Sequence, residues 1–431
     1  MIFSFPKKIN TIFLIIITSY TAIGQQPFAP DYPLDLPYYD FVHYKKNIIK
    51  FPGDSLAFER FFNGYDSINF KGEGRLNVVH LGGSHIQADI YTHRLRQRLQ
   101  HVMPGGNGGR GVLFPYRMAK TNNPANYKGM FTGEWQTRRS VQNINNLKLG
   151  LTGITGRTTD KEATITIILN IDSLEHYDFN RVRVYHEIDT QSYMVIPSPI
   201  HNVNSMWVNE ELGYSEFTLR DYTDTLKLQM LQIDSTQHYF QLYGIELLTD
   251  DPGLVYHAIG INGASLPSYL KSELFVPHLK AVQPDMVVIS IGTNDGNTRR
   301  FDRDVYKQNY DTLIQNILKA APNTALLLTV PNDSYLYRKY INKNTAKIQQ
   351  VIYELAEEYN AGIWDFYEIM GGLNSIFVWY RFGLARYDKI HFTWKGYMFK
   401  ADLLHNAILK AYGQHLEKQK TVGKGHAWGR E

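Results

Sequence analysis

The segment from residue 76 to residue 89 constrains the fold more than any other, because an apolar run stops there at a tight turn. Residues 76–81 read Leu-Asn-Val-Val-His-Leu, and Gly82-Gly83-Ser84 follows directly. Beyond the turn, apolar side chains recur at helical spacing, at Ala88, Tyr91, Leu95, Leu99 and Val102. The pattern predicts a buried strand, a tight turn and then a helix.

Ser84 stands at the carboxyl end of the predicted strand and at the start of the predicted helix. Open α/β sheets bind their ligands at this place, and a helix N-terminus stabilises negative charge. Ser84 is therefore a candidate nucleophile. Serine is also a preferred helix N-cap, so this stretch alone leaves both interpretations open.

Strands and helices alternate again after residue 252. The predicted strands are 254–261, 286–291, 324–330 and 362–366. The predicted helices run from after Ser265 to about 282, over about 304–320, over about 342–359, and from Thr393 to about 412. Such alternation implies an α/β fold with a parallel sheet that helices cover on both faces.

Residues 121–250 have a different character. Short β-rich runs alternate there with turn residues, at 163–169, 181–188, 192–196, 225–231 and 238–248. This spacing predicts a β-sandwich, and an insertion of this size into a surface loop costs little free energy. We expect it to bind or position substrate; the alternative is a stabilising appendage. The glycine-rich segment 105–111 lacks the lysine of a phosphate loop, and we expect a flexible loop near the pocket.

The N-terminus is typical of a secretory signal peptide over residues 1–24, with Lys7 and Lys8, a short apolar region and small residues before Gln25. An uncleaved membrane anchor is the alternative, although the apolar run is short for a membrane span. The 431-residue chain has no cysteine, which excludes disulfides and a thiolate metal site. Export without cysteine fits the bacterial envelope, in the periplasm or outside the cell.

The charge balance argues against a nucleic-acid partner. The whole chain carries +4, and loss of residues 1–24 removes two lysines and no acid, which leaves +2. A protein that binds by neutralising phosphates is usually far more basic. We also expect no stable membrane insertion once the signal is cleaved.

Polar residues gather where the predicted parallel strands end. Ser84, Gly263 and Asn294 follow three of these strands, and Asp388 and His391 lie just before the last helix. The carboxyl ends of parallel strands meet at one edge of a sheet, so these residues are expected to converge. Separately, each has a plain structural explanation as a turn, a helix cap or a surface pair; together they favour one site.

Acyl transfer needs this set of groups. A serine hydroxyl becomes a nucleophile when a base removes its proton, and His391 is the candidate base. Asp388, three residues earlier, can hold the far nitrogen of that ring and stabilise the imidazolium. The N–H of Ser84, the N–H of Gly263 and the side-chain amide of Asn294 can donate to the developing oxyanion. No metal or cofactor is required.

These residues resemble the four sequence blocks of the SGNH (GDSL-like) hydrolase superfamily over about residues 73–115 and 253–412. The blocks are Gly82-Gly83-Ser84-His85, Gly263 within Ile261-Asn262-Gly263-Ala264-Ser265, Gly292-Thr293-Asn294-Asp295, and Asp388-Lys389-Ile390-His391. The resemblance implies a three-layer α/β/α core with a five-stranded parallel sheet. It also implies Ser84, Gly263, Asn294 and His391 as signature residues, with Asp388 completing the triad. One residue departs from the family pattern: Gly83 stands where the family usually has aspartate.

The predicted domain order then has five parts. They are the signal peptide 1–24, an arm without chemistry at 25–72, a discontinuous hydrolase-like domain at 73–120 and 251–412, the inserted β-sandwich at 121–250, and a flexible basic tail at 413–431.

A core of this kind, split by a carbohydrate-module-like sandwich, resembles the bacterial peptidoglycan O-acetylesterases. Phe240–Glu246 leading into Gly260–Ala264, and Met370-Gly371-Gly372 before Asp388, carry this narrower resemblance.

We therefore expect an exported serine esterase that removes O-acetyl groups from peptidoglycan or another polysaccharide. One alternative is an O-acetyltransferase for an exported glycan, which would use the same residues but exclude water. The other is a glycan-binding protein with an inactive core, which Gly83 keeps open.

Overall fold

A six-stranded sheet forms the centre of the molecule, a computed structural model that describes residues 36–102, 106–171 and 176–427. Its strand order is β1-β19-β16-β15-β2-β14. The bounds are β1 Ile49–Lys50, β2 Arg75–Gly82, β14 Gly253–Gly260, β15 Met286–Ser290, β16 Ala325–Val330 and β19 Gly362–Asp365. Five strands run parallel, and β1 pairs antiparallel with β19. The predicted five-stranded parallel sheet is confirmed, and β1 extends it at one edge.

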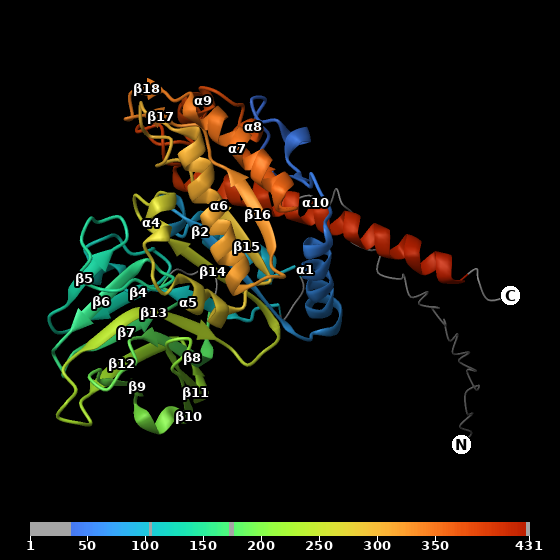
Figure 1. The fold of residues 1–431 in the computed structure, drawn as a ribbon. Coiled ribbons are helices and arrows are strands. Elements are labelled where there is room, and N and C mark those ends of the chain that lie inside the picture. The colour runs from blue at the N-terminus through green and yellow to red at the C-terminus, as the bar shows by residue number, and fades with distance from the viewer. Residues whose placement is uncertain (1–35, 103–105, 172–175, 428–431) are drawn as a thin grey trace, which may run out of the picture.

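Helices cover both faces of this sheet (Figure 1). One face packs against α1 Leu56–Asp66, α3 Tyr91–Gln100, α8 Phe366–Ile369, α9 Ser375–Arg381 and α10 Trp394–Ala427. The other packs against α4 Leu266–Leu270, α5 Phe275–Val282, α6 Arg303–Ala320 and α7 Asn344–Glu358. Successive strand side chains point to opposite faces, so Val78 joins the first core and Val79 the second. The three-layer α/β/α core is confirmed.

The β-rich part of the chain forms two further sheets, which lie beside the core in Figure 1. The larger has the order β10-β11-β8-β13-β6-β5, with β3 also paired to β13, and the smaller has the order β4-β7-β12-β9. The bounds are β3 Gly109–Leu113, β4 Lys128–Phe131, β5 Gln136–Arg139, β6 Ile154–Thr158, β7 Thr164–Ile168, β8 Phe179–His186, β9 Met194–Ser198, β10 Val203–Asn209, β11 Tyr214–Thr223, β12 Thr225–Leu231 and β13 Phe240–Leu248. One apolar cluster takes side chains from both sheets, including Ile165 and Val182. This is the β-sandwich that the sequence predicts.

The glycine-rich segment is not a flexible loop in the part that the structure describes. Residues 109–113 form the buried strand β3, which pairs with β13 although it precedes the predicted start of the insertion. The glycines permit close backbone packing: a Cβ at Gly109 would lie 2.7 Å from Leu248 Cα, and one at Gly111 would lie 3.0 Å from the Tyr256 carbonyl oxygen. The expectation of a loop was wrong because these glycines serve contact between strands.

Two helices that the sequence predicts as continuous are each divided. The helix after Ser84 consists of α2 Ser84–Gln87 and α3, and the helix after Gly263 consists of α4 and α5. Between α2 and α3 the backbone of Asp89 is left-handed, with φ of 47°. Apolar periodicity continues across the break, with Tyr91 and Leu95 buried, so the spacing alone does not reveal it.

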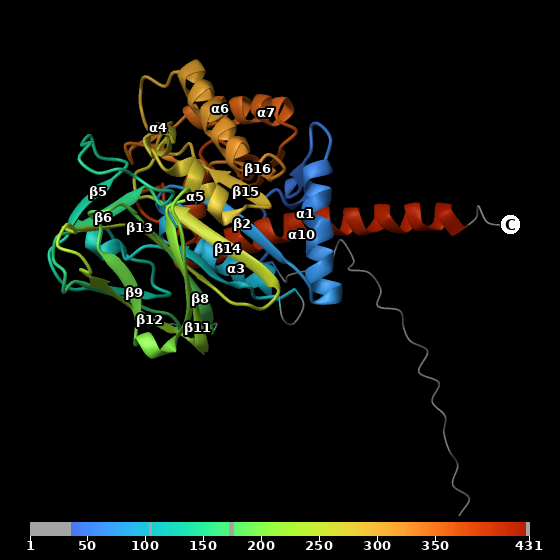
Figure 2. The ribbon, with the colours of Figure 1, turned by 60° about the horizontal axis from the view of Figure 1, so that its bottom comes forward.

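The predicted flexible tail is wrong for residues 413–427, which continue α10. This helix extends away from the body of the molecule (Figures 1 and 2). Leu416 is buried, and Gln419 donates to Asn63 and Asp66 on α1, so packing against α1 explains why the helix continues past Gly413. The predicted signal peptide lies outside the described residues.

No helix in the described part of the chain combines the length and the apolar character needed to cross a membrane.

A buried charge cluster secures the break between α2 and α3. Asp89 forms ion pairs with Arg96 at 3.1 Å and with Arg110 at 2.5 Å, and both guanidinium groups are buried. Thr92 and Asn126 also donate to the carboxylate. Burial alone would raise the pKa of Asp89, but the two arginines outweigh burial and lower the pKa below its ordinary value.

We expect Asp89→Ala to lower the free energy of unfolding by about 3–5 kcal/mol, because it leaves two buried cations without a partner. Since the folded pKa is depressed, the stabilisation is present above the unfolded value of about 3.9 and is lost as the pH falls below it. Urea unfolding between pH 3 and 8 measures both effects. The control is Asp304→Ala, whose side chain is 91% exposed. Equal stability of the two variants at pH 7 would contradict the assignment.

Candidate active site

Ser84 lies at the point where the order of the parallel strands reverses. β2 sits between β14 and β15, so the chain goes from β2 to one neighbour and later returns to the other. Ligand clefts in open α/β sheets form outside the strand ends at such a switch point. Ser84 follows β2, and Asn294 follows β15. Topology thus brings the first and third sequence blocks together.

The Ser84 hydroxyl is hydrogen-bonded to His391 and does not cap a helix. The N-cap of α2 is Gly83, and no side chain caps this helix. Ser84 Oγ lies 2.8 Å from His391 Nε2, and His391 Nδ1 lies 2.8 Å from Asp388 Oδ2. With Nδ1–H donating to the carboxylate, Nε2 is free to accept the serine proton. This is the geometry of a nucleophile, a base and a group that orients the base.

Asp388 is held in its ionised form. Its other oxygen accepts the backbone N–H groups of Ile390 and His391, each at 3.0 Å. Burial would raise the pKa of Asp388, but the hydrogen bonds from the His391 ring and from these two N–H groups outweigh it and lower the pKa. The carboxylate therefore remains charged at neutral pH and can accept the Nδ1–H of His391.

The loop that carries Asp388 and His391 is fastened to the loop after β16. Asn332 Nδ2 donates to the Ile390 carbonyl at 3.2 Å, and the N–H of Tyr335 donates to the Lys389 carbonyl at 2.8 Å. Lys389 itself has a left-handed backbone, with φ of 53°. This turn directs the carboxylate back toward the histidine ring.

The second and third sequence blocks are clamped to each other. Asn294 Nδ2 donates to the Ala264 carbonyl at 2.8 Å, and Asp295 Oδ1 accepts the N–H of Leu266 at 2.9 Å. Gly263, exposed and with φ of 84°, lies in the turn that they hold. Burial raises the pKa of Asp295 to about 6, against the opposing hydrogen bond from Leu266. The N–H of Gly263 makes no hydrogen bond within the described residues, so it remains available to a ligand.

Gly83, the departure from the family pattern, lies beside the Asn294 amide. A Cβ at this position would be 3.2 Å from Asn294 Nδ2 and 3.6 Å from the Ala264 carbonyl oxygen. An aspartate here would occupy the space next to the Asn294 amide. With glycine at position 83, the hydrogen bond to the Ala264 carbonyl holds the side-chain amide of Asn294 in place.

Two residues near the site received no role in the sequence analysis. The His85 ring packs against His391, with centroids 5.1 Å apart, and its Nδ1 is hydrogen-bonded to the Tyr397 hydroxyl at 2.9 Å. Burial lowers the pKa of His85, and the neighbouring charge of His391 lowers it further. The His85 side chain is therefore neutral, and its ring packs behind the candidate base. Gln87 accepts the N–H of Asn262 at 2.6 Å and donates to Asn122 at 2.8 Å. Both residues lie close to Ser84 in the sequence, which could have marked them as part of the site. The spacing of residues alone does not identify the side chains that they contact.

One cleft of about 960 Å³ contains all five predicted site residues: Ser84, Gly263, Asn294, Asp388 and His391. The 21 lining residues also include several amides and exposed aromatic side chains, among them Asn122, Asn262, Tyr387 and Trp394. The structure therefore brings together every residue that the sequence assigned to the site.

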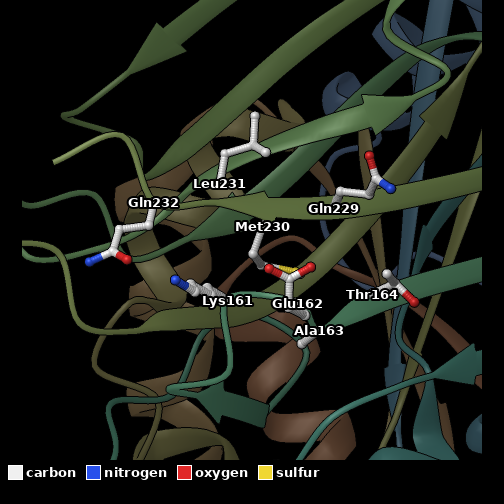
Figure 3. A pocket seen from close by; sticks show the side chains of 8 residues that line it. All are labelled: Lys161, Glu162, Ala163, Thr164, Gln229, Met230, Leu231 and Gln232. Carbon is white, nitrogen blue, oxygen red and sulfur yellow. The ribbon is translucent and has the colours of Figure 1, made fainter. Parts of the chain in front are cut away.

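A separate hollow of about 320 Å³ lies on the smaller β-sheet, at the ends of β7 and β12 (Figure 3). Lys161, Glu162 and Gln232 are among the residues that line it. It holds no serine, histidine or cysteine that could act as a nucleophile or base. Within the described residues, no group of three or more His, Asp or Glu side chains is placed to hold a metal ion.

Comparison with known proteins finds one family model that matches part of the chain. Residues 234–399 match the model of the GDSL-like Lipase/Acylhydrolase family, a range that includes Gly263, Asn294, Asp388 and His391 but not Ser84. No curated protein is detectably similar in sequence to this chain.

Among solved structures, a peptidoglycan O-acetylesterase has a TM-score of 0.70 at 21% identity, and the match covers 84% of this chain and 99% of the other. A lipase/acylhydrolase from Enterococcus faecalis matches with a TM-score of 0.29 at 20% identity, covering 37% of this chain and 77% of the other. An acetyl xylan esterase matches with a TM-score of 0.29 at 24% identity, covering 36% and 81%. The resemblance expected from the sequence is confirmed: residues 234–399 match a GDSL-like lipase/acylhydrolase family model, and the overall fold is similar to that of a peptidoglycan O-acetylesterase.

Proposed function

We propose that this protein is an exported carbohydrate esterase that removes O-acetyl groups from peptidoglycan or a related polysaccharide. The single observation that carries the proposal is the hydrogen-bonded chain Ser84–His391–Asp388, with both links at 2.8 Å. Support for the substrate class comes from the overall similarity to a peptidoglycan O-acetylesterase and from a cleft rich in amides and aromatic rings. Support for export comes from the signal-like residues 1–24.

The reaction proceeds in two acyl-transfer steps. Ser84 Oγ attacks the acetyl carbonyl while His391 Nε2 takes the hydroxyl proton. The tetrahedral intermediate collapses as His391 returns this proton to the departing sugar oxygen, which leaves an acetyl group on Ser84. His391 then removes a proton from water, the resulting hydroxide attacks the acetyl group, and Ser84 regains its proton as acetate leaves.

The negative charge on the carbonyl oxygen is stabilised by preorganised donors. Ser84 is the first residue of α2, so its N–H has no partner within that helix. The N–H of Gly263 and the amide of Asn294 lie in the same cleft. Because the clamp between Asn294 and Ala264 already fixes these groups, they need little reorganisation when charge develops.

Ser84→Ala should abolish acetate release from O-acetylated peptidoglycan, a loss of up to about 10⁶-fold in kcat. Acetate is measured enzymatically with O-acetylated peptidoglycan and acetylated xylan as parallel substrates, and Ser205→Ala on exposed β10 serves as the control. Release that persists in Ser84→Ala would contradict the proposal. So would acetyl transfer to an added sugar without release of free acetate, which would instead identify a transferase.

Asp388→Asn should lower kcat by about 10³- to 10⁴-fold, because an NH2 group that donates replaces the oxygen that accepts the Nδ1–H of His391. The neutral amide then favours the wrong tautomer of His391 and cannot stabilise the imidazolium. The asparagine oxygen can still accept the N–H groups of Ile390 and His391, so the loop should keep its fold. Because the pKa of Asp388 is lowered, the wild-type carboxylate stays charged over the pH range tested. Asparagine carries no charge at any of these pH values, so raising the pH should not restore the variant. Rate profiles from pH 5 to 9, with circular dichroism as a folding control, test this; an unchanged kcat would refute the role of Asp388.

Asn294→Ala should reduce kcat by about 10²- to 10³-fold, the usual effect of losing one oxyanion donor. Asn204→Ala removes an exposed amide on β10, outside the cleft, and is the matched control, with no expected loss. Steady-state kinetics on an acetylated sugar compares the two variants. Equal losses would show that Asn294 has no special role in the transition state.

A further inference from the structure

Positive charge is concentrated in two segments of the chain, residues 335–343 and 373–395. Their one acidic residue is Asp388, which is buried and hydrogen-bonded to His391. The basic residues are Arg338, Lys339 and Lys343 in the first segment, and Arg381, Arg386, Lys389 and Lys395 in the second. Taking these residues away from the 43 basic and 41 acidic ones of residues 25–431 leaves 36 basic and 40 acidic ones. The charge of the chain is therefore segregated.

The two segments form one surface. The first contains the hairpin of β17 Tyr335–Leu336 and β18 Tyr340–Ile341, and the second contains α9. The Tyr335 hydroxyl donates to Asn374 Oδ1, and its N–H donates to the Lys389 carbonyl, both at 2.8 Å. In Figure 1, β17, β18 and α9 lie at the opposite end of the molecule from β9 and β12. We call the exposed side chains of residues 335–343 and 373–395 the basic face.

The cations of the basic face are not neutralised by acids of the same molecule. Within the described residues, none of the seven forms an ion pair with a carboxylate. Six are exposed, and Lys389 is half-buried above the rings of Tyr335 and Tyr380. Neighbouring like charges repel one another and create a positive potential at the surface. An anionic partner would relieve this repulsion.

Apolar side chains lie among these cations. Phe382, Leu373, Ile341 and Phe377 are 52%, 47%, 46% and 37% exposed. Large exposed apolar groups with a polar rim mark contacts with proteins or membranes. Side chains without any polar atom add little to the binding of a soluble polyanion, but they enter the boundary between lipid headgroups and acyl chains.

Tyrosines complete the basic face. Tyr337, Tyr340 and Tyr380 are all exposed, and the cation of Lys339 lies 5.5 Å from the centre of the Tyr340 ring. Tyrosine and tryptophan are enriched where proteins meet the membrane interface, because their rings are apolar and their polar groups reach water. Cations, apolar side chains and tyrosines together fit an anionic lipid surface better than a soluble anion.

We propose that the basic face binds the surface of a membrane that contains anionic lipids. Basic clusters attract acidic headgroups, and buried apolar side chains strengthen this attachment without any spanning helix. The inference goes beyond the proposed function, because it concerns where the protein is held and not which ester it cleaves. Tyr337 and Arg338 also line the cleft that contains Ser84, so docking holds the candidate active site at the membrane surface.

Vesicle flotation tests the role of lipid charge. The protein is mixed with vesicles of phosphatidylcholine alone, or of phosphatidylcholine and phosphatidylglycerol in equal parts. Binding to the mixed vesicles should be tighter by about tenfold or more at 50 mM NaCl, and the preference should shrink at 500 mM because salt screens charges. Equal binding to the two kinds of vesicle, or no binding to either, would overturn the inference.

A charge reversal locates the contact. Lys339→Glu/Arg381→Glu changes two exposed residues of the basic face that do not line the cleft, and it should weaken binding to the mixed vesicles by about tenfold or more. The control is Lys161→Glu/Lys227→Glu, which changes the net charge equally at exposed residues of the smaller β-sheet and the turn before it. Circular dichroism checks the fold of both. Equal losses in the two variants would show that net charge alone governs binding and would refute the basic face.

An apolar variant distinguishes a membrane from a soluble polyanion. Leu373→Ser/Phe377→Ser should weaken binding to the mixed vesicles by about fivefold or more and leave binding to soluble polyglutamate unchanged. The control Ile200→Ser/Ile233→Ser removes two exposed apolar side chains of the β-sandwich and should bind as the wild type does. Unchanged vesicle binding in Leu373→Ser/Phe377→Ser would overturn the inference in favour of a soluble polyanion. None of these measurements requires ester hydrolysis, so they stand apart from the esterase assays.

Discussion

The hydrogen bond between Ser84 Oγ and His391 Nε2 joins residues that are 307 positions apart in the chain. Each end is fixed by a different part of the fold: the strand order of the sheet delivers Ser84 to the switch point, and the loop before α10 delivers His391. The bond is useful only if both ends stay within hydrogen-bond reach, about 2.6–3.2 Å between the two heavy atoms, because the base must be able to take the serine proton. Much of the surrounding polar structure serves this requirement.

Three supports hold the site. The buried Asp89–Arg96–Arg110 cluster ends α2 soon after Ser84. Gln87 and the pair Asn294–Asp295 hold the turn that contains Gly263. Asn332 and Tyr335 hold the loop between Asp388 and His391. Most of these bonds join segments distant in sequence, so tertiary contacts hold the site residues in place.

Much of this arrangement was readable from the sequence. The apolar runs that end at Ser84, Gly263 and Asn294 identify parallel strands, and parallel strands must bring their carboxyl ends to one edge. The sequence did not predict the break between the helices at Asp89, because the apolar spacing continues through it. The two buried arginines that neutralise the Asp89 carboxylate reach it through tertiary contacts. The strand at 109–113 was missed for a related reason: glycines needed for close packing have the composition of a loop. The helix past Gly413 depends on contacts with α1 that no local pattern shows. The contacts of His85 with Tyr397 and of Gln87 with Asn262 span more than 170 positions.

The most direct test of the account is to react the folded protein with a serine-directed fluorophosphonate and to locate the adduct by peptide mass spectrometry. We expect one adduct per molecule, on Ser84, formed much faster than in His391→Ala, because only a serine activated by its base reacts quickly. Labelling at another serine, no labelling of the folded protein, or equal rates with and without His391 would contradict the claim that Ser84 and His391 form a working nucleophile and base.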